Sequence, residues 1–419
     1  MNSKERFAAT LAHRQPDRVC VDLGATAVSG IAASTLSKLR QAILGEKDYR
    51  VKVTEPFEML GDVDDTLREA LGIDIVGLPG RTNLYGFENA DWKPFTLFDG
   101  TPVLVPGGFK VKVDTNGDLL LYPAGDTSVP PSGRMPKGGF YFDTIIRQDP
   151  IDDAKLDPAD NLEEFSLLSD EQVQDFARRG KALAEQTGCG IIISLPGAGI
   201  GDIALVPAPF LRRPRGIRDV EEWYVSTVLR RDYVHAIFDK QTEIAVENIK
   251  RLGKAVGKLA QAAFVCGTDF GTQRGPFISN QAYRELYSPC YKRLNAAVHK
   301  HTPWKTLKHS CGSVAALLPD MIEDGFDILN PVQCSAAGMD PKTLKKEFGG
   351  RITFWGGGVD TQKTLPFGTP EEVYREVRER IDIFNDGGGF VFNPIHNIQA
   401  GTSVENIQAM FRAIRDSHG

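Results

Sequence analysis

The C-terminal part of the chain repeats one pattern four times, and this repetition limits the possible folds more than any other feature. In each repeat an apolar strand leads into a loop rich in Gly, Asn or Gln, and a capped helix follows. Two of the helix starts are explicit: Asp340 precedes Pro341, and Thr369-Pro-Glu-Glu372 is a capping box. The strand segments are 304–313, 326–334, 352–362 and 389–396. Four such units within about 115 residues predict alternating parallel strands and helices.

Four more apolar strands are expected earlier in the chain, at Arg18–Leu23, Ile73–Pro79, Gly190–Leu195 and Gln261–Cys266. Helical segments separate them, so the chain as a whole has eight strands in alternation with helices. A chain of 419 residues suits one such barrel with insertions. We therefore predict a single α/β unit over residues 1–419, a (β/α)8 TIM barrel.

Between about residues 82 and 149 apolar and polar residues alternate, in place of the helical spacing seen elsewhere, which predicts a small antiparallel β insertion in the N-terminal half. Asp99-Gly100 and Asn116-Gly117 are strong hairpin turns within it. The stretch Pro130–Gly139 near its end is basic and rich in Pro and Gly. Two interpretations stay open for this stretch, namely a loop over the barrel mouth and an inert surface loop.

Composition excludes several classes of function. Hydrophobic residues make up 41% and charged residues 25% of the chain, and the net charge is -6, so nucleic acid is not an expected partner. We see neither a signal-peptide core nor an apolar run long enough to span a bilayer. Six cysteines are scattered along the chain, at positions 20, 189, 266, 290, 311 and 334, and they form no disulfide framework. This pattern places the chain in a reducing cytoplasm. We expect Cys20 and Cys290 to lie in the core.

In a barrel of this kind the chemistry lies where the strands end. Glycine turns expose Asp269, which makes it the candidate catalytic residue. Substrate-binding candidates are the other strand-end polar residues Gln273, Asn330, Gln333 and Asp360, although such residues also cap helices and pin turns.

His309 and Cys311 lie two residues apart in an extended segment, so both side chains point to the same side. An imidazole and a thiolate suit zinc, and His396 from the last strand is the candidate third ligand, with Cys334 in reserve. Three ligands and one open position describe a catalytic zinc site. The alternative is a buried cysteine beside a histidine that is bonded to a backbone carbonyl.

Several motifs of the C-terminal half resemble the uroporphyrinogen decarboxylase superfamily, specifically its branch of corrinoid-dependent methyltransferases, which includes enzymes similar to methylcobalamin:coenzyme M methyltransferase. The motifs are Lys308–Gly312, Gly325–Gln333, Gly356–Gln362 with Gly368–Val373, and Asn393–Asn397 with Glu405-Asn406. The resemblance implies a barrel in which His309 and Cys311 are zinc ligands. It also implies methyl transfer between methylcobalamin on a partner corrinoid protein and a small-molecule acceptor or donor.

Two departures from the family pattern affect this expectation. The arginine-rich N-terminal motif that holds substrate carboxylates in the decarboxylases has no match after Met1, which disfavours porphyrinogen decarboxylation. The branch that methylates thiols usually has a cysteine near the position of His396. The alternatives are a metal-free decarboxylase or lyase in which Asp269 acts alone, and a ligand-binding barrel without catalysis.

Overall fold

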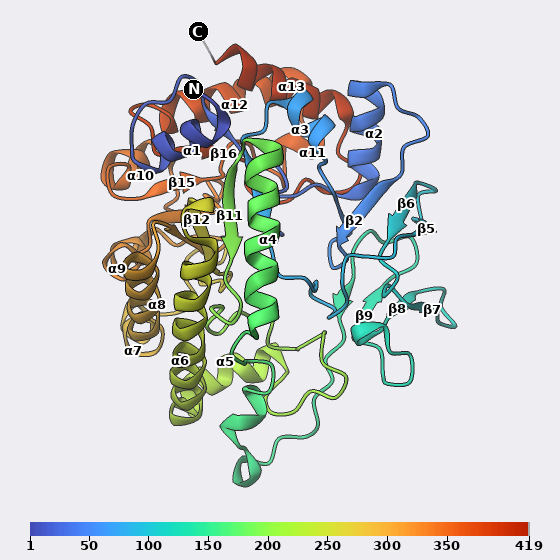
Figure 1. Ribbon diagram of the computed structural model, residues 1–419, viewed down its shortest axis with the longest axis vertical. Helices are drawn as coiled ribbons and strands as arrows, with labels where there is room; N and C mark the ends of the chain where they lie inside the picture. The colour runs from blue at the N-terminus through green and yellow to red at the C-terminus, as the bar shows by residue number, and fades with distance from the viewer. Residues whose placement is uncertain (418–419) are drawn as a thin grey trace.

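The computed structural model describes residues 1–417, and its largest sheet has eight parallel strands (Figure 1). In sheet order the strands are β1 (Cys20–Val21), β16 (Phe390–Phe392), β15 (Thr353–Trp355), β14 (Ile328–Asn330), β13 (Lys305–His309), β12 (Ala262–Cys266), β11 (Gly190–Ser194) and β4 (Ile75–Leu78). Each strand lies within one of the eight predicted segments, and neighbours in sequence order are neighbours in the sheet. The predicted (β/α)8 barrel is confirmed.

The barrel closes between β4 and β1 through a buried carboxylate. The backbone N–H of Asp74 donates to the carbonyl of Val21 at 2.8 Å, and the carboxylate of Asp74 accepts from the N–H of Val21 at 3.0 Å. Two guanidiniums, those of Arg6 and Arg18, donate to the same carboxylate at 2.6 to 2.8 Å. Asp74 is fully buried, so this seam joins the first and second barrel strands with a charged group in place of a regular ladder.

Helices surround the sheet, as the alternation predicts. The structure has α1 (Ser3–Leu11), α2 (Ala33–Leu44), α3 (Asp65–Leu71), α4 (Asp170–Thr187), α5 (Val220–Leu229), α6 (Arg231–Val256), α7 (Asn280–Leu286), α8 (Ser288–His301), α9 (Leu318–Glu323), α10 (Pro341–Phe348), α11 (Thr364–Phe367), α12 (Pro370–Phe384) and α13 (Val404–Asp416). Their starts follow the sequence signals: Thr369 and Glu372 form the predicted capping box of α12, and Asp340 caps α10. The caps satisfy N–H groups that a helix leaves free in its first turn.

Helix α1 closes the N-terminal end of the barrel. Phe7 is fully buried and meets the ring of Trp355 edge to face, with ring centroids 5.6 Å apart. The first residue of β11 is Gly190, and a Cβ there would lie 2.3 Å from the ring of Phe7. The interior of the barrel is therefore filled by apolar side chains at this end, which leaves the opposite end, where the strands finish, for polar groups.

The β insertion is larger than predicted and is not purely antiparallel. One sheet is antiparallel and contains β7 (Val111–Val113), β8 (Leu119–Leu121), β9 (Gly133–Met135) and β10 (Asp143–Thr144). The other contains β2 (Val51–Glu55), β3 (Leu60–Gly61), β5 (Lys93–Thr96) and β6 (Pro102–Val105), and β2 pairs with β6 in parallel. Strands β2 and β3 precede residue 82, so the predicted boundary misses them. Their segments are too short to show alternation clearly.

The stretch Pro130–Gly139 is also resolved by the structure. Its residues Gly133–Met135 form β9, which pairs with β8 and β10, and the rest of the stretch is loop on either side of this strand. Figure 1 shows the insertion strands, coloured from blue to teal, grouped at one side of the barrel. Among the described residues, no helix combines the length and the apolar character that crossing a membrane requires.

The seam at Asp74 yields the first prediction. Replacement of Asp74 by Ala leaves the Arg18 guanidinium without a carboxylate partner and leaves the buried Arg6 with Asp17 alone, and we expect a loss of about 3–5 kcal/mol in the free energy of unfolding. Urea denaturation followed by circular dichroism measures this loss. The matched control is Glu185→Gln, which removes an exposed ion pair with Lys181 and should cost less than about 1 kcal/mol. Equal stability of the two variants would contradict the importance of the seam.

Candidate metal centre

His309 is the last residue of β13, and Cys311 lies in the tight turn that follows. The turn requires glycine at position 312, where φ is +82° and a Cβ would lie 2.4 Å from the backbone of Gly271. This close approach lets the loop after β12 contact the loop after β13. As a result, Cys311 lies beside Asp269, whose carboxylate accepts a hydrogen bond from the Cys311 N–H at 2.6 Å.

His396 reaches the same place from the other side of the barrel. It follows β16 in a loop that is tied to the loop after β1, because the Asn397 side chain accepts from the Gly30 N–H at 2.6 Å and donates to the Ala27 carbonyl at 2.8 Å. Neither bond uses the imidazole of His396. The loop is therefore fixed by its neighbours while the ring is free to bind a ligand.

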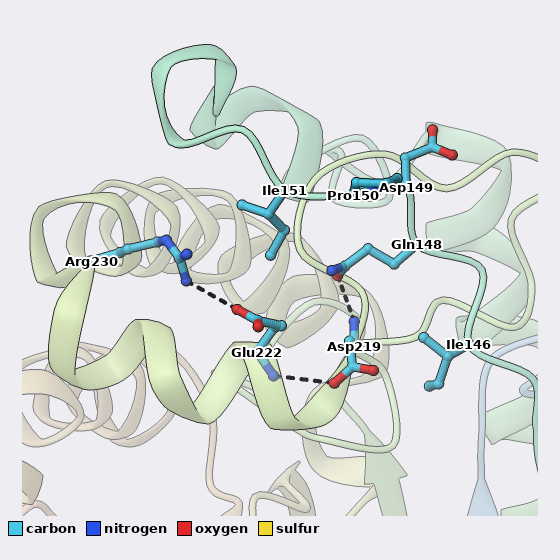
Figure 2. Close-up of a pocket in the computed structure, with 8 residues that line it drawn as sticks. All are labelled: Ile146, Gln148, Asp149, Pro150, Ile151, Asp219, Glu222 and Arg230. Atoms are coloured by element: carbon cyan, nitrogen blue, oxygen red, sulfur yellow. Dashed lines mark hydrogen bonds and ion pairs between the residues drawn. The ribbon is translucent and has the colours of Figure 1, made fainter.

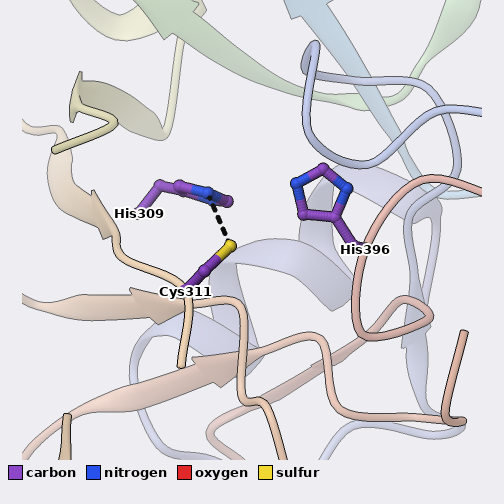
Figure 3. Close-up of side chains that lie close together, drawn as sticks. All are labelled: His309, Cys311 and His396. Atoms are coloured by element: carbon purple, nitrogen blue, oxygen red, sulfur yellow. Dashed lines mark hydrogen bonds between the residues drawn. The ribbon is translucent and has the colours of Figure 1, made fainter. Parts of the chain in front are cut away.

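The three predicted ligands meet at the barrel mouth (Figure 3). One ligand atom from each of His309, Cys311 and His396 lies within 4.8 Å of the other two. The Cys311 Sγ is 3.4 Å from the His309 Nε2, and the two imidazole centroids are 5.7 Å apart. Tetrahedral zinc places N and S ligands about 3.3 to 3.8 Å from one another, so the closest pair already has the required spacing. The donor set of one thiol and two imidazoles fits a zinc ion with an open fourth position.

Asn330, at the end of β14, fixes the orientation of the His309 ring. Its amide oxygen lies 2.6 Å from the His309 Nδ1, and its amide nitrogen donates to the carbonyl of Trp355 at 2.9 Å. The second bond determines which way the amide faces, so the oxygen must accept from an Nδ1–H. The tautomer that results leaves the Nε2 lone pair directed at Cys311 and available to a metal.

The electrostatics of the site favour the uncharged forms of the His309 imidazole and the Cys311 thiol when no cation is bound. Burial lowers the pKa of His309 to about 4, and the charge of Asp269 only partly opposes this effect. Burial, followed by the negative charge of Asp269, raises the pKa of the Cys311 thiol well above its ordinary value. At neutral pH the imidazole is thus ready to bind a metal, whereas the thiol must first lose its proton.

Asp269 lies where the sequence predicts a catalytic residue. Its Oδ1 is 3.8 Å from the His309 Nε2, and its side chain is 29% exposed, so it is accessible to a small molecule at the mouth. Asp269 thus contacts the cluster without belonging to it. Its catalytic role stays a prediction.

The predicted substrate-binding residues occupy different positions. Gln273 is exposed at the rim and donates to Gln362 at 3.2 Å. The Gln333 side chain is buried and accepts from the Gly312 N–H at 2.7 Å, and Asp360 accepts from the N–H groups of Gln362 and Lys363. Substrate binding by these residues stays a prediction, and Asn330, Gln333 and Asp360 each already use at least one side-chain polar atom to hold the site.

Cys334, the reserve ligand, does not join the cluster. Its thiol lies 3.4 Å from the carbonyl of Val332 and 4.0 Å from that of Gly357, and burial raises its pKa to about 12. Cys20 and Cys290 are buried, as expected of small core residues. Among the described residues every cysteine is a free thiol.

Two residues near the cluster were not found by sequence reasoning. Burial and then the charges of Asp269 and Asp202 raise the pKa of the Tyr224 phenol, which lies on α5. The charge of Glu58, between β2 and β3, contributes to the raised pKa of Cys311. Neither residue ends a barrel strand, so the rule that directs attention to strand ends passes over both.

A separate cavity of about 500 Å³ lies between residues 146–151 and α5 (Figure 2). Its Arg230 guanidinium is bonded to Glu222 and to Asp153, which leaves no free positive charge for an anionic ligand. The N–H groups at the start of α5 are likewise occupied by the Asp219 carboxylate. The lining of this cavity includes none of the cluster residues.

Comparison with known proteins agrees with the geometry. The family model for uroporphyrinogen decarboxylase (URO-D) matches residues 208–417, which contain all three cluster residues. The chain belongs to the uroporphyrinogen decarboxylase family. The predicted family resemblance is confirmed, and the matched region covers barrel strands β12 to β16 together with α5 to α13.

Within this family, the chain is similar to the methylated-thiol–coenzyme M methyltransferase of Methanosarcina mazei, with 28% identity over 220 residues. The match covers 51% of this chain and 53% of that protein, so the chain spans about half the length of this relative. A solved methyltransferase structure from Methanosarcina mazei covers 100% of both chains at 18% identity, with a TM-score of 0.55. This second likeness supports the fold alone.

The charge states at the cluster predict how metal binding depends on pH. Between pH 6 and 8 the His309 imidazole is neutral and the Cys311 thiol is protonated, so binding of zinc should release about one proton from this pair. The affinity should then rise about tenfold per pH unit. Calorimetric titration of zinc in two buffers with different ionisation enthalpies counts the protons. A parent chain that binds zinc without releasing a proton would contradict this assignment.

Proposed function

We propose that this chain is a zinc-dependent methyltransferase that moves a methyl group between a corrinoid protein carrying methylcobalamin and a small-molecule acceptor or donor. The observation that carries the proposal is the meeting of His309, Cys311 and His396 at the C-terminal end of the barrel strands. Barrel enzymes perform their chemistry at this end. The likeness to a methylated-thiol–coenzyme M methyltransferase supports methyl transfer as the reaction class.

His309, Cys311 and His396 would hold the zinc ion, with the open position left to the substrate. When bound there, zinc acts as a Lewis acid that lowers the pKa of a coordinated acceptor and makes it a nucleophile at neutral pH. A single thiolate among the ligands offsets only one of the two charges of zinc. The centre therefore keeps a net positive charge, which favours an anionic acceptor more strongly than a site with two thiolates.

Asp269 supplies the proton acceptor in this proposal. Its carboxylate is partly exposed beside the cluster, and the bond from the Cys311 N–H holds it in place. The acceptor transfers its proton to Asp269, and its lone pair forms the bond to the methyl carbon while the Co–C bond of the partner's methylcobalamin breaks and leaves its electron pair on cob(I)alamin. The same residues serve the reverse direction, in which a methylated substrate loses its methyl group to the corrinoid.

The four predicted substrate-binding residues have two different roles in this proposal, one at the exposed rim and one within the site. Gln273 at the rim, paired with Gln362, is free to bind the outer part of a substrate. Asn330, Gln333 and Asp360 contribute by holding His309, the turn at Gly312 and the loop after β15 in position. We therefore assign direct substrate contact to Gln273 and a positioning role to the other three.

Metal content tests the zinc centre. Chain purified without added metal should contain one zinc ion, and Cys311→Ser should lose it, because removal of a thiolate ligand weakens binding strongly. Elemental analysis by mass spectrometry measures the ratio of zinc to protein. The control is Cys334→Ser, which alters the neighbouring thiol outside the cluster and should keep full zinc content. Retention of zinc in Cys311→Ser would exclude this set of ligands.

Methyl transfer tests the reaction. The zinc-loaded chain should demethylate free methylcobalamin in the presence of a panel of thiols that includes coenzyme M, measured by the change in cobalamin absorbance. Asp269→Asn should slow the reaction roughly 10²–10⁴-fold through loss of the proton acceptor, with zinc content unchanged. Asp239→Asn, at an exposed position on α6, is the matched control. Full activity of Asp269→Asn would contradict the role of this carboxylate.

A further inference from the structure

Lys308 is a fully buried cation in the barrel wall directly behind the metal centre. Its neighbours on β13, Leu307 and His309, face the barrel interior and the mouth, so the alternation of a strand directs Lys308 outward to the helix layer. There the ammonium lies 4.8 Å from the ring centroid of Phe270 and 5.7 Å from that of Tyr291. Among the described residues it forms no ion pair with a carboxylate, which is rare for a buried lysine.

The ammonium is used instead to bind two backbone carbonyls. It donates to the carbonyl of His309 at 2.7 Å and to that of Thr268. Thr268 precedes Asp269, and its hydroxyl in turn donates to the carbonyl of Ile200 in the loop after β11 at 2.6 Å. One buried cation thus links the strand end that carries a proposed metal ligand to the loop that carries the proposed proton acceptor.

Three other hydrogen bonds join the same pair of loops, one of them from the Ser313 N–H to the Thr272 carbonyl at 2.8 Å. The Phe270 N–H donates to the Ser310 hydroxyl at 2.9 Å, and the Cys311 N–H donates to Asp269 at 2.6 Å. Lys308 is the only charged donor among these groups, and the Cys311 bond has a charged acceptor; bonds with an ionised partner are roughly twice as strong as neutral ones. The relative position of His309 and Asp269 depends most on these two charge-assisted interactions.

We infer that Lys308 is a positioning residue that fixes the ends of β12 and β13 so that His309 and Asp269 keep their places around a bound metal. The inference rests on the metal centre of the proposed function and adds a residue that no metal-ligand motif contains. Lys308 touches neither the metal nor the substrate in this assignment. It acts through the backbone carbonyls of His309 and Thr268.

Positioning and simple electrostatics predict opposite effects when the charge is removed. A buried cation repels a second cation, so electrostatics alone predict that a neutral residue at 308 tightens metal binding. If the main role is positioning, loss of the ammonium releases two carbonyls and metal binding weakens. The sign of the change in affinity therefore identifies the role.

The experiment measures Co²⁺ binding by Lys308→Met, a variant that keeps the apolar stem and loses the ammonium. We expect Co²⁺ affinity to fall roughly 10- to 100-fold and the intense visible band of a four-coordinate site to weaken. Loss of stability alone would lower the thermal midpoint without changing the spectrum of the folded, metal-loaded protein. Lys305→Met is the matched control, because Lys305 lies on the same strand, is half-exposed and pairs with Asp327 at the other end. This control should leave the Co²⁺ affinity and spectrum unchanged.

A second variant, Phe270→Leu, keeps Lys308 and the backbone bonds but removes the ring beneath the ammonium. It should weaken Co²⁺ binding about two- to fivefold, and it decides the question if Lys308→Met does not fold. Unchanged or tighter binding in the folded variants overturns the inference. A parent chain that binds no Co²⁺ overturns the metal centre and this inference together. A parent chain that binds Co²⁺ but transfers no methyl group disproves only the methyl-transfer proposal.

Discussion

Closure of the barrel at Asp74 is the constraint on which the candidate site depends. Strands β13 and β16, which lead to His309 and His396, are separated by β14 and β15, and three steps across a flat sheet amount to about 14 Å. The two imidazole centroids are nevertheless 5.7 Å apart. Only a sheet curved into a closed barrel directs both side chains into one mouth. The carboxylate of Asp74 holds the seam that completes this curvature, at the end of the barrel opposite the site.

The site is built in two layers with different physical tasks. The inner groups, His309 and Cys311, are kept uncharged by burial, so that a cation is needed before the thiol ionises. The outer groups hold the inner ones in place: Asn330 is hydrogen-bonded to the His309 ring, and Gln333 accepts from the Gly312 N–H in the turn that carries Cys311. Outer groups of this kind fix the tautomer and direction of a ligand, and metal affinity depends on them nearly as much as on the ligands.

Sequence reasoning located every barrel strand because buried parallel strands are continuous apolar runs with clear loop and cap signals. It also selected His309, Cys311 and His396, since strand ends are where a barrel gathers its polar groups. It assigned Asn330 and Gln333 to substrate binding and did not predict their bonds to His309 and Gly312, because residue type alone does not show which partner an amide binds. The insertion boundary was missed because β2 pairs with β6, a strand far ahead in the sequence, and β3 is only two residues long and pairs with β2. Sequence reasoning gave no role to Lys308, because its burial follows from the packing of α8 and the loop after β12 against β13.

The charges around the cluster also explain why a buried lysine is tolerated there. A buried ammonium without a carboxylate partner is costly unless carbonyl oxygens and ring faces replace its lost hydration. Lys308 has both, in the carbonyls of His309 and Thr268 and the ring of Phe270. Burial raises the pKa of Asp202 while the Lys308 charge lowers it, so that the cation offsets part of the burial cost of a mouth carboxylate. The strand β13 thereby carries the candidate metal ligand His309 on its inner side and the buried cation Lys308 on its outer side.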